Sequence, residues 1–104
     1  MTPADILEKA AEKVRASWCQ NVGSRVIGDA FGVCAVISLD RARGTDANGK
    51  KINFGAFQDA WEALAQHVGG GVIEWNDTPG RTQDEVVEAL LQAAKKLRNV
   101  EVST

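Results

Sequence analysis

The stretch that decides the fold is TQDEVVEALLQAAKKLR, residues 82–98, because every local signal in it favours the same helix. Thr82, with Glu85 three residues later, is a capping-box pattern. Acidic residues begin the stretch and basic residues end it, which complements the helix dipole. The apolar side chains recur at helical spacing and form one stripe: Val86, Val87, Leu90, Leu91, Ala94 and Leu97. The pattern predicts an amphipathic helix whose stripe belongs to the core.

A helix with a similar start is predicted at the N-terminus. Thr2 can cap it, and Pro3 suits the first helical position, where no amide hydrogen is needed. Asp5 follows three residues after the cap, close to a capping box. Its apolar stripe is Leu7, Ala10, Ala11, Val14 and Trp18. This helix is expected to end near Ser17.

A third helix is predicted over FGAFQDAWEALAQHV, residues 54–68. Asn53 is the expected cap, and three successive glycines, residues 69–71, end the helix. Such a run implies a hinge or a position with positive φ. Phe57, Trp61, Leu64 and Val68 occupy one face, with Phe54 and Ala65 beside it. The polar loop before this helix contains Asn48-Gly49, a strong turn dipeptide.

The segment AFGVCAVISLDRA, residues 30–42, is apolar almost all round, so periodicity cannot separate a buried strand from a buried helix. Its β-branched residues favour a strand. Its length, a potential cap at Asp29 and the basic residues before Gly44 favour a helix. We expect a central buried helix over residues 30–43. The stretch before it is interpreted as an irregular loop, with a short hairpin around residues 18–28, near Gly23-Ser24, as the alternative.

These segments predict one mostly all-α domain, residues 1–104, with four helices, irregular connectors and a frayed tail over residues 98–104. A chain of this size holds one modest core. No internal repeat or low-complexity segment interrupts it. The predicted core residues are Leu7, Val14, Trp18, Phe31, Val33, Ile37, Phe57, Trp61, Leu64, Trp75, Val86, Leu90 and Leu97.

Bulk composition excludes several classes of function. Twelve basic against fourteen acidic residues give a net charge of -2, which argues against a dedicated nucleic-acid binder. No apolar run is long enough for a membrane span, and the N-terminus lacks the order of a secretory signal. We therefore expect a cytoplasmic protein with Cys19 and Cys34 reduced. One histidine and no CxxC motif predict no metal site, and no cofactor is expected.

The segment W-N-D-T-P-G-R-T, residues 75–82, is dense in turn signals. Pro79-Gly80 suits a turn that needs positive φ at the glycine. Asn76 and Asp77 can accept amide hydrogens in an Asx-turn, and Trp75 can anchor the loop to the core.

Turn chemistry leaves Arg81 unexplained. It could pair with Asp77 or Glu74, or meet an anionic ligand near a helix N-terminus. We therefore take Arg81, Asp77, Asn76 and Trp75 as the candidate contact residues for a ligand or partner.

The same segment resembles the C-terminal signature of a small uncharacterised family found in actinobacteria and their phages, and more widely in bacteria. Trp18 and the run Cys34-Ala35-Val36-Ile37 fill two further positions of that pattern, so the resemblance covers most of the chain. Val36 and Ile37 depart from it, because the pattern has glycine and leucine there. The resemblance implies a small helical domain and no established activity. The family's frequency in phages implies an accessory protein that binds something of the host.

No catalytic set is indicated by the sequence. His67 is the single histidine, and its spacing from Glu62, Glu74 and Asp77 gives no warrant for acid–base catalysis.

Charge is uneven along the chain. The basic patch is Arg41, Arg43, Lys50 and Lys51, whereas residues 52–94 carry seven acidic residues against one arginine.

Three functional hypotheses follow. The first is a non-enzymatic cytoplasmic accessory protein of phage origin that acts by protein–protein interaction on a host factor, with a homodimer also open. The second is a small-molecule or anion-binding protein, or a minor enzyme, with a pocket near Trp75, Asp77 and Arg81. The third, disfavoured by the net charge, is nucleic-acid contact through the basic loop at residues 41–51.

Overall fold

The computed structural model describes residues 1–20, 24–27 and 30–103. In chain order its elements are α1 (Pro3–Ala16), β1 (Ser24–Ile27), β2 (Ala30–Val33), α2 (Ala35–Ala42), α3 (Phe54–Val68), α4 (Val72–Asn76) and α5 (Gln83–Ser103). The mostly helical class predicted from the sequence is confirmed. The described residues contain one more helix than expected, because VIEWN forms α4.

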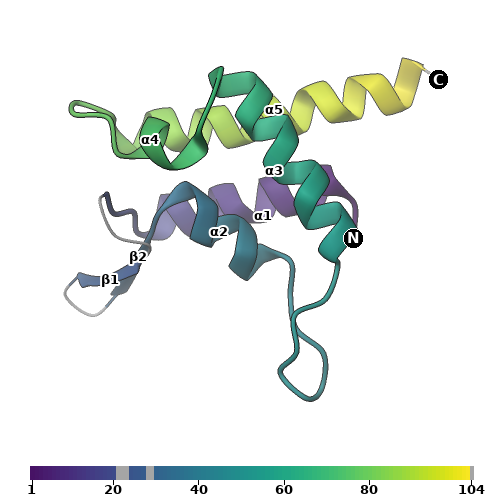
Figure 1. Cartoon of the computed structure of the whole chain (residues 1–104), viewed down its shortest axis with the longest axis horizontal. Coiled ribbons are helices and arrows are strands. Elements are labelled where there is room, and N and C mark those ends of the chain that lie inside the picture. Colours follow the sequence, from purple (N-terminus) through teal and green to yellow (C-terminus); the bar gives the residue numbers. More distant parts are fainter. Residues whose placement is uncertain (21–23, 28–29, 104) are drawn as a thin grey trace.

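The helices α1 and α5 form the central pair of the fold and run antiparallel (Figure 1). At one end, Gln83 Nε2 donates to Val14 O at 2.6 Å. At the other, Arg98 Nη2 donates to Asp5 Oδ1 at 2.9 Å, and Arg98 Nε donates to Glu8 Oε2 at 3.0 Å. The α3 helix crosses both, and α2 packs on α1. Polar contacts therefore fix both ends of the central helix pair.

The core lies between α1, α5 and the helices that cross them. Of the predicted core residues, Leu7, Val14, Leu64, Val86 and Leu90 are fully buried. Trp18, Ile37, Phe57, Trp61, Trp75 and Leu97 are half-buried and pack against that core. Phe31 and Val33 lie among the residues whose side chains the structure does not describe. Alanines complete the α1–α5 contact, and such small residues let two helices approach closely.

The second helix is shorter than expected. Residues 30–33 form β2, which pairs antiparallel with β1 in the register Ser24↔Val33 and Ile27↔Ala30. The expectation of a helix over residues 30–43 is therefore wrong for its first turn, where the β-branched and aromatic residues follow strand preference. Cys34 is the actual cap, and its Sγ accepts Ile37 N–H at 3.5 Å.

The hairpin alternative is present, at residues 24–33 rather than around residues 18–28. Two expectations from the sequence, the turn at Gly23 and the cap at Asp29, lie outside the described residues.

The other helix ends follow the predicted chemistry except at Asn53. The capping box of Thr2 and Asp5 is present, and Gly69 ends α3 with φ +82°. Asn53 stands at the start of α3 with φ +58°, but its side chain caps nothing. Its Nδ2 donates instead to Arg43 O at 2.8 Å. The α5 helix extends to Ser103, and fraying of residues 98–104 stays a prediction.

Candidate functional site

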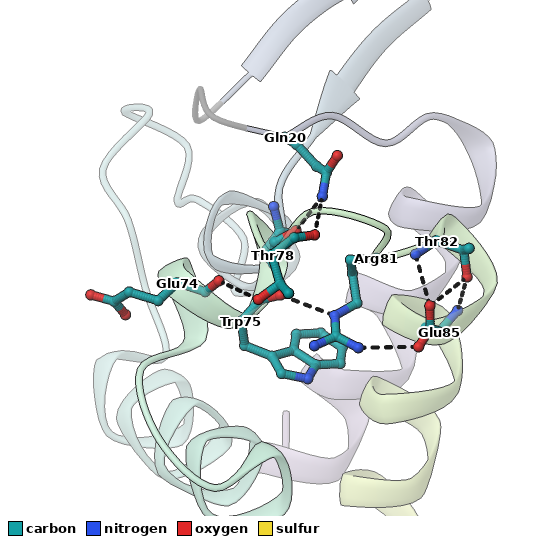
Figure 2. Close-up of polar contacts among 8 residues, drawn as sticks. Gln20, Glu74, Trp75, Thr78, Arg81, Thr82 and Glu85 are labelled. Atoms are coloured by element: carbon teal, nitrogen blue, oxygen red, sulfur yellow. Dashed lines mark hydrogen bonds and ion pairs between the residues drawn. The ribbon is translucent and has the colours of Figure 1, made fainter.

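The loop between α4 and α5 is a tight turn. Arg81 N–H donates to Thr78 O at 3.0 Å, and Gly80 has φ +87°, as the third position of a type II turn requires. Thr78 Oγ1 donates to Glu74 O at 2.8 Å, which ties the turn back to α4 (Figure 2). Gln20 Nε2 adds a bond to Thr78 O at 3.1 Å. The turn at Pro79-Gly80 is therefore formed as predicted, whereas the oxygen of Asn76 accepts bonds from Trp18 and Ala35 rather than from the amides of an Asx-turn.

Asn76 is a buried connector, with 1% of its surface exposed. Its Oδ1 accepts Trp18 Nε1–H at 2.8 Å and Ala35 N–H at 3.1 Å. Its Nδ2 donates to Cys19 O at 3.2 Å and to Asp77 Oδ1 at 3.0 Å. One amide thus joins the chain after α1, the start of α2 and the end of α4. Its polar atoms face the protein, whereas the sequence made it a candidate contact residue.

Arg81 is held by its own loop. Its guanidinium carbon lies 4.2 Å from the centre of the Trp75 ring. Its Nε donates to Trp75 O at 3.0 Å, and its Nη1 pairs with Glu85 Oε2 at 3.1 Å (Figure 2). The charge partner is Glu85 rather than the Asp77 or Glu74 expected from the sequence. Only 19% of the side chain is exposed.

The capping box at the start of α5 is formed as predicted. Thr82 N–H donates to Glu85 Oε1 at 3.0 Å, and Glu85 N–H donates to Thr82 Oγ1 at 3.2 Å. The bond from the Thr82 backbone lowers the pKa of Glu85, and the bonds from the Thr82 side chain and Arg81 add to the effect. Glu85 therefore serves both the helix cap and Arg81, which fixes the arginine relative to the helix.

An open cleft of about 570 Å³ lies beside Trp75, between α3, α4 and α5. It is lined by His67, Val68, Trp75, Asp84, Glu85, Glu88 and Ala89. Desolvation lowers the pKa of His67, and the nearby Lys96 lowers it further. Asp84 and Glu88 line the cleft, whereas its third carboxylate, Glu85, is already paired with Arg81. The charge of the cleft therefore favours a cation rather than the anion expected from the sequence.

The four residues of the basic patch have different surroundings in the structure. Arg43 is buried, donates from Nε to Ile52 O at 2.7 Å and stacks over Phe57 at 4.9 Å. Lys51 Nζ pairs with Asp40 Oδ2 at 3.0 Å. The remaining members, Arg41 and Lys50, lie on the surface. Nucleic-acid contact through residues 41–51 stays a prediction.

The α3 helix presents an aromatic surface, because Phe57 and Trp61 pack against the core but are only half-buried, and Phe54 is exposed. Phe54 is 59% exposed and Ile52 is 40% exposed. Only Ala60 and Leu64 of α3 are fully buried. We define the α3 face as the residues that line a groove of about 300 Å³ along this helix: Phe54, Phe57, Gln58, Trp61 and Glu62. The sequence does carry a signal for this exposed surface, since apolar residues occupy more than one side of α3.

Two aromatic residues of the α3 face pack against each other. The rings of Phe57 and Trp61 meet edge to face at 5.8 Å and 90°. The Arg43 guanidinium carbon lies 5.3 Å from the centre of the Phe54 ring, which braces the exposed end. The groove is therefore preformed, with one strongly exposed aromatic side chain at its end.

Within the described part of the chain, no group of three or more His, Cys, Asp or Glu side chains could hold a metal ion. Cys19 and Cys34 are both buried, and the two are not joined in a disulfide. Among the helices formed by the described residues, none is long and apolar enough to cross a membrane.

A comparison with models of protein families places the chain in a family. The model of a family described as "Family of unknown function (DUF6197)" matches residues 1–96. A search of curated proteins and a search of solved structures each found no match.

Proposed function

The chain belongs to the DUF6197 family, whose function is unknown, and from that premise we propose that it is a non-enzymatic module that acts by protein–protein contact. The observation that carries this proposal is the exposure of Phe54 on the α3 face. Membership fits the predicted uncharacterised family. The W-N-D-x-P-G-R-T signature, a phage origin and a host factor as the target remain predictions.

The make-up of the α3 face is typical of a protein interface. Aromatic residues are enriched at interface cores, and tryptophan is frequent among the residues that dominate binding energy. Here Phe54, Phe57 and Trp61 supply the apolar centre, and Gln58 and Glu62 supply a polar edge. Exposed apolar surface edged by polar groups marks sites of interaction in globular proteins. The α3 face is therefore the surface at which we place the partner.

Capture with matched variants tests this proposal. Phe54→Ser removes the exposed ring from the α3 face, and Ile73→Ser is its control, because Ile73 is 53% exposed on α4. We expect wild type and the control to bind a protein, whether another chain or a second copy, that Phe54→Ser binds at least tenfold more weakly. Binding that is equal in all three proteins, or absent from all three, would contradict the proposal.

The cleft beside Trp75 supports a second candidate function, the binding of a small cationic molecule. Its volume lies within the range typical of ligand sites. A bound ligand raises the unfolding temperature by mass action. We expect spermidine to raise it and ATP to leave it unchanged, with the effect of spermidine reduced in Glu88→Gln. Stabilisation by ATP alone would favour the original anion hypothesis instead.

A further inference from the structure

We propose that the partner covering the α3 face is a second copy of this chain, in a two-fold dimer with the two α3 helices antiparallel. This inference rests on the proposed function, because it names the occupant of the same surface. It is carried by two properties of the described residues: the shape of the α3 face and the distribution of charge along it.

The shape of the α3 face is self-complementary. A two-fold interface uses the same patch on both subunits, so a protrusion and its matching recess must lie on one surface. Phe54 is the protrusion at the start of α3, and the groove continues along the helix to Trp61 and Glu62. An antiparallel copy brings the Phe54 ring of each chain over the far end of the other chain's groove. Each ring would then bury apolar surface that the monomer exposes.

The spacing along α3 gives a specific register. An axis between Phe57 and Gln58 places Phe54 of one copy opposite Trp61 of the other, since the two positions are equally distant from the axis. The same register places Glu62 of one copy opposite Asn53 of the other, close in sequence to Lys51 of that other copy. Phe54 and Trp61 then form an aromatic pair at each end of the contact, and such pairs add to the energy of area burial.

The charge along the surface favours an antiparallel arrangement. Near the start of α3, the exposed basic residues Arg41, Lys50 and Lys51 stand against Asp40 and Asp46, and Asp40 already pairs with Lys51. Further along α3, Asp59 and Glu62 are exposed, and α3 carries no lysine or arginine. An antiparallel copy sets the positive end of each chain against the negative end of the other, whereas a parallel copy would set like charges together.

A second copy of the chain matches both the shape and the charge of the α3 face. A different protein would need an apolar groove with the opposite order of charge to match the α3 face. A copy turned by the two-fold axis carries both features by symmetry. The same chain is therefore the occupant that the shape and the charge favour together.

Sedimentation equilibrium over a range of concentrations tests the dimer. We expect wild type and Ile73→Ser to dimerise, and Phe54→Ser to dissociate at least tenfold more readily. Circular dichroism will show whether Phe54→Ser keeps its helices, so that loss of the dimer is not mistaken for unfolding. Glu62→Lys should also weaken the dimer, because it reverses the negative end of the surface.

Disulfide trapping tests the register independently of Phe54. Gln58 lies beside the proposed axis, so Gln58→Cys should form a covalent dimer under mild oxidation. Gln66→Cys is the matched control: on an antiparallel helix pair it would lie about 25 Å from its own copy at the helical rise per residue. Cys19 and Cys34 are buried, so wild type gives the background. Equal trapping at both positions would overturn the register.

The inference and the proposed function can fail separately. A wild-type chain that stays monomeric at high concentration overturns the dimer. If such a monomer still binds a different protein in a Phe54-dependent way, the proposed function stands. If neither self-association nor binding of another protein depends on Phe54, both are overturned.

Discussion

The indole Nε1 of Trp18 donates a hydrogen bond to Asn76 Oδ1 at 2.8 Å, across 58 positions of the sequence. The same oxygen accepts the N–H of Ala35, the first residue of α2. A tryptophan after the first helix and the asparagine of the W-N-D segment are therefore parts of one polar junction. The junction sets where α2 begins and holds α4 against the end of α1.

Asn76→Ala should lower the free energy of unfolding by about 3 kcal/mol or more. It removes the partner of the buried Ala35 N–H and of the part-buried Trp18 Nε1–H, and each unsatisfied group costs about 1–3 kcal/mol. Urea denaturation followed by circular dichroism measures the loss. Gln20→Ala is the control, because Gln20 also bonds this loop but is only half-buried. A loss no larger for Asn76 than for Gln20 would rule out the junction as a main support.

Thr82→Ala should lower the free energy of unfolding by about 1 kcal/mol, since it removes the cap of α5. Thr82→Ser keeps the hydroxyl that accepts Glu85 N–H, so it should retain most of the stability. Thermal and urea unfolding of the two variants provide the comparison. Equal losses would show that the hydroxyl bond does not account for the effect.

Arg81→Ala distinguishes a structural arginine from one that serves a ligand. The stacking on Trp75 and the bond to Trp75 O predict a loss of about 1–2 kcal/mol in unfolding free energy. Arg81→Lys should not restore it, because lysine lacks the planar fork that bonds and stacks at once. Urea unfolding followed by tryptophan fluorescence measures the stability of both variants. An unchanged stability would make Arg81 a candidate ligand contact again.

Acid stability should depend on Asp5. Bonds from the Thr2 backbone and from Arg98 lower the pKa of Asp5 from 3.8 to about 2. Because the folded state holds the carboxylate charged, its contribution is present above the ordinary pKa and is lost as the pH falls through about 2. Asp5→Asn should therefore make the free energy of unfolding fall less steeply between pH 3.8 and about 2. Urea midpoints measured across that range check this, and an unchanged slope would contradict it.

Much of the local structure could be predicted because its causes lie within a few residues. The capping boxes of Thr2 and Thr82, the turn at Gly80 and the end of α3 at Gly69 each depend on neighbours in the sequence. The apolar spacing likewise identified most of the buried stripes of α1 and α5, although it missed the fully buried Ile6. The prediction failed at residues 30–33, where an apolar run fits a strand or a helix equally well and pairing with β1 decided the outcome.

The candidate site was less predictable, because the partners of Asn76 come from distant segments. Arg81 has several acidic residues within a few positions, and the sequence does not show which of them it meets. The sequence singled out Asn76 and Arg81, but not their partners Trp18, Ala35 and Cys19 for the first or Glu85 for the second. The exposure of Phe54 was also hidden, since periodicity says which residues share a face and not which face another helix covers.

By itself the sequence determined the helical class, the capped starts of α1 and α5, the end of α3 and the turn before α5, because capping, glycine conformation and apolar period act over short distances. Tertiary structure alone decided that Asn76 is a connector and that the α3 face is left open. These outcomes depend on which surfaces meet when α1, α3 and α5 pack. That packing is set by the shapes and charges of residues far apart in the chain.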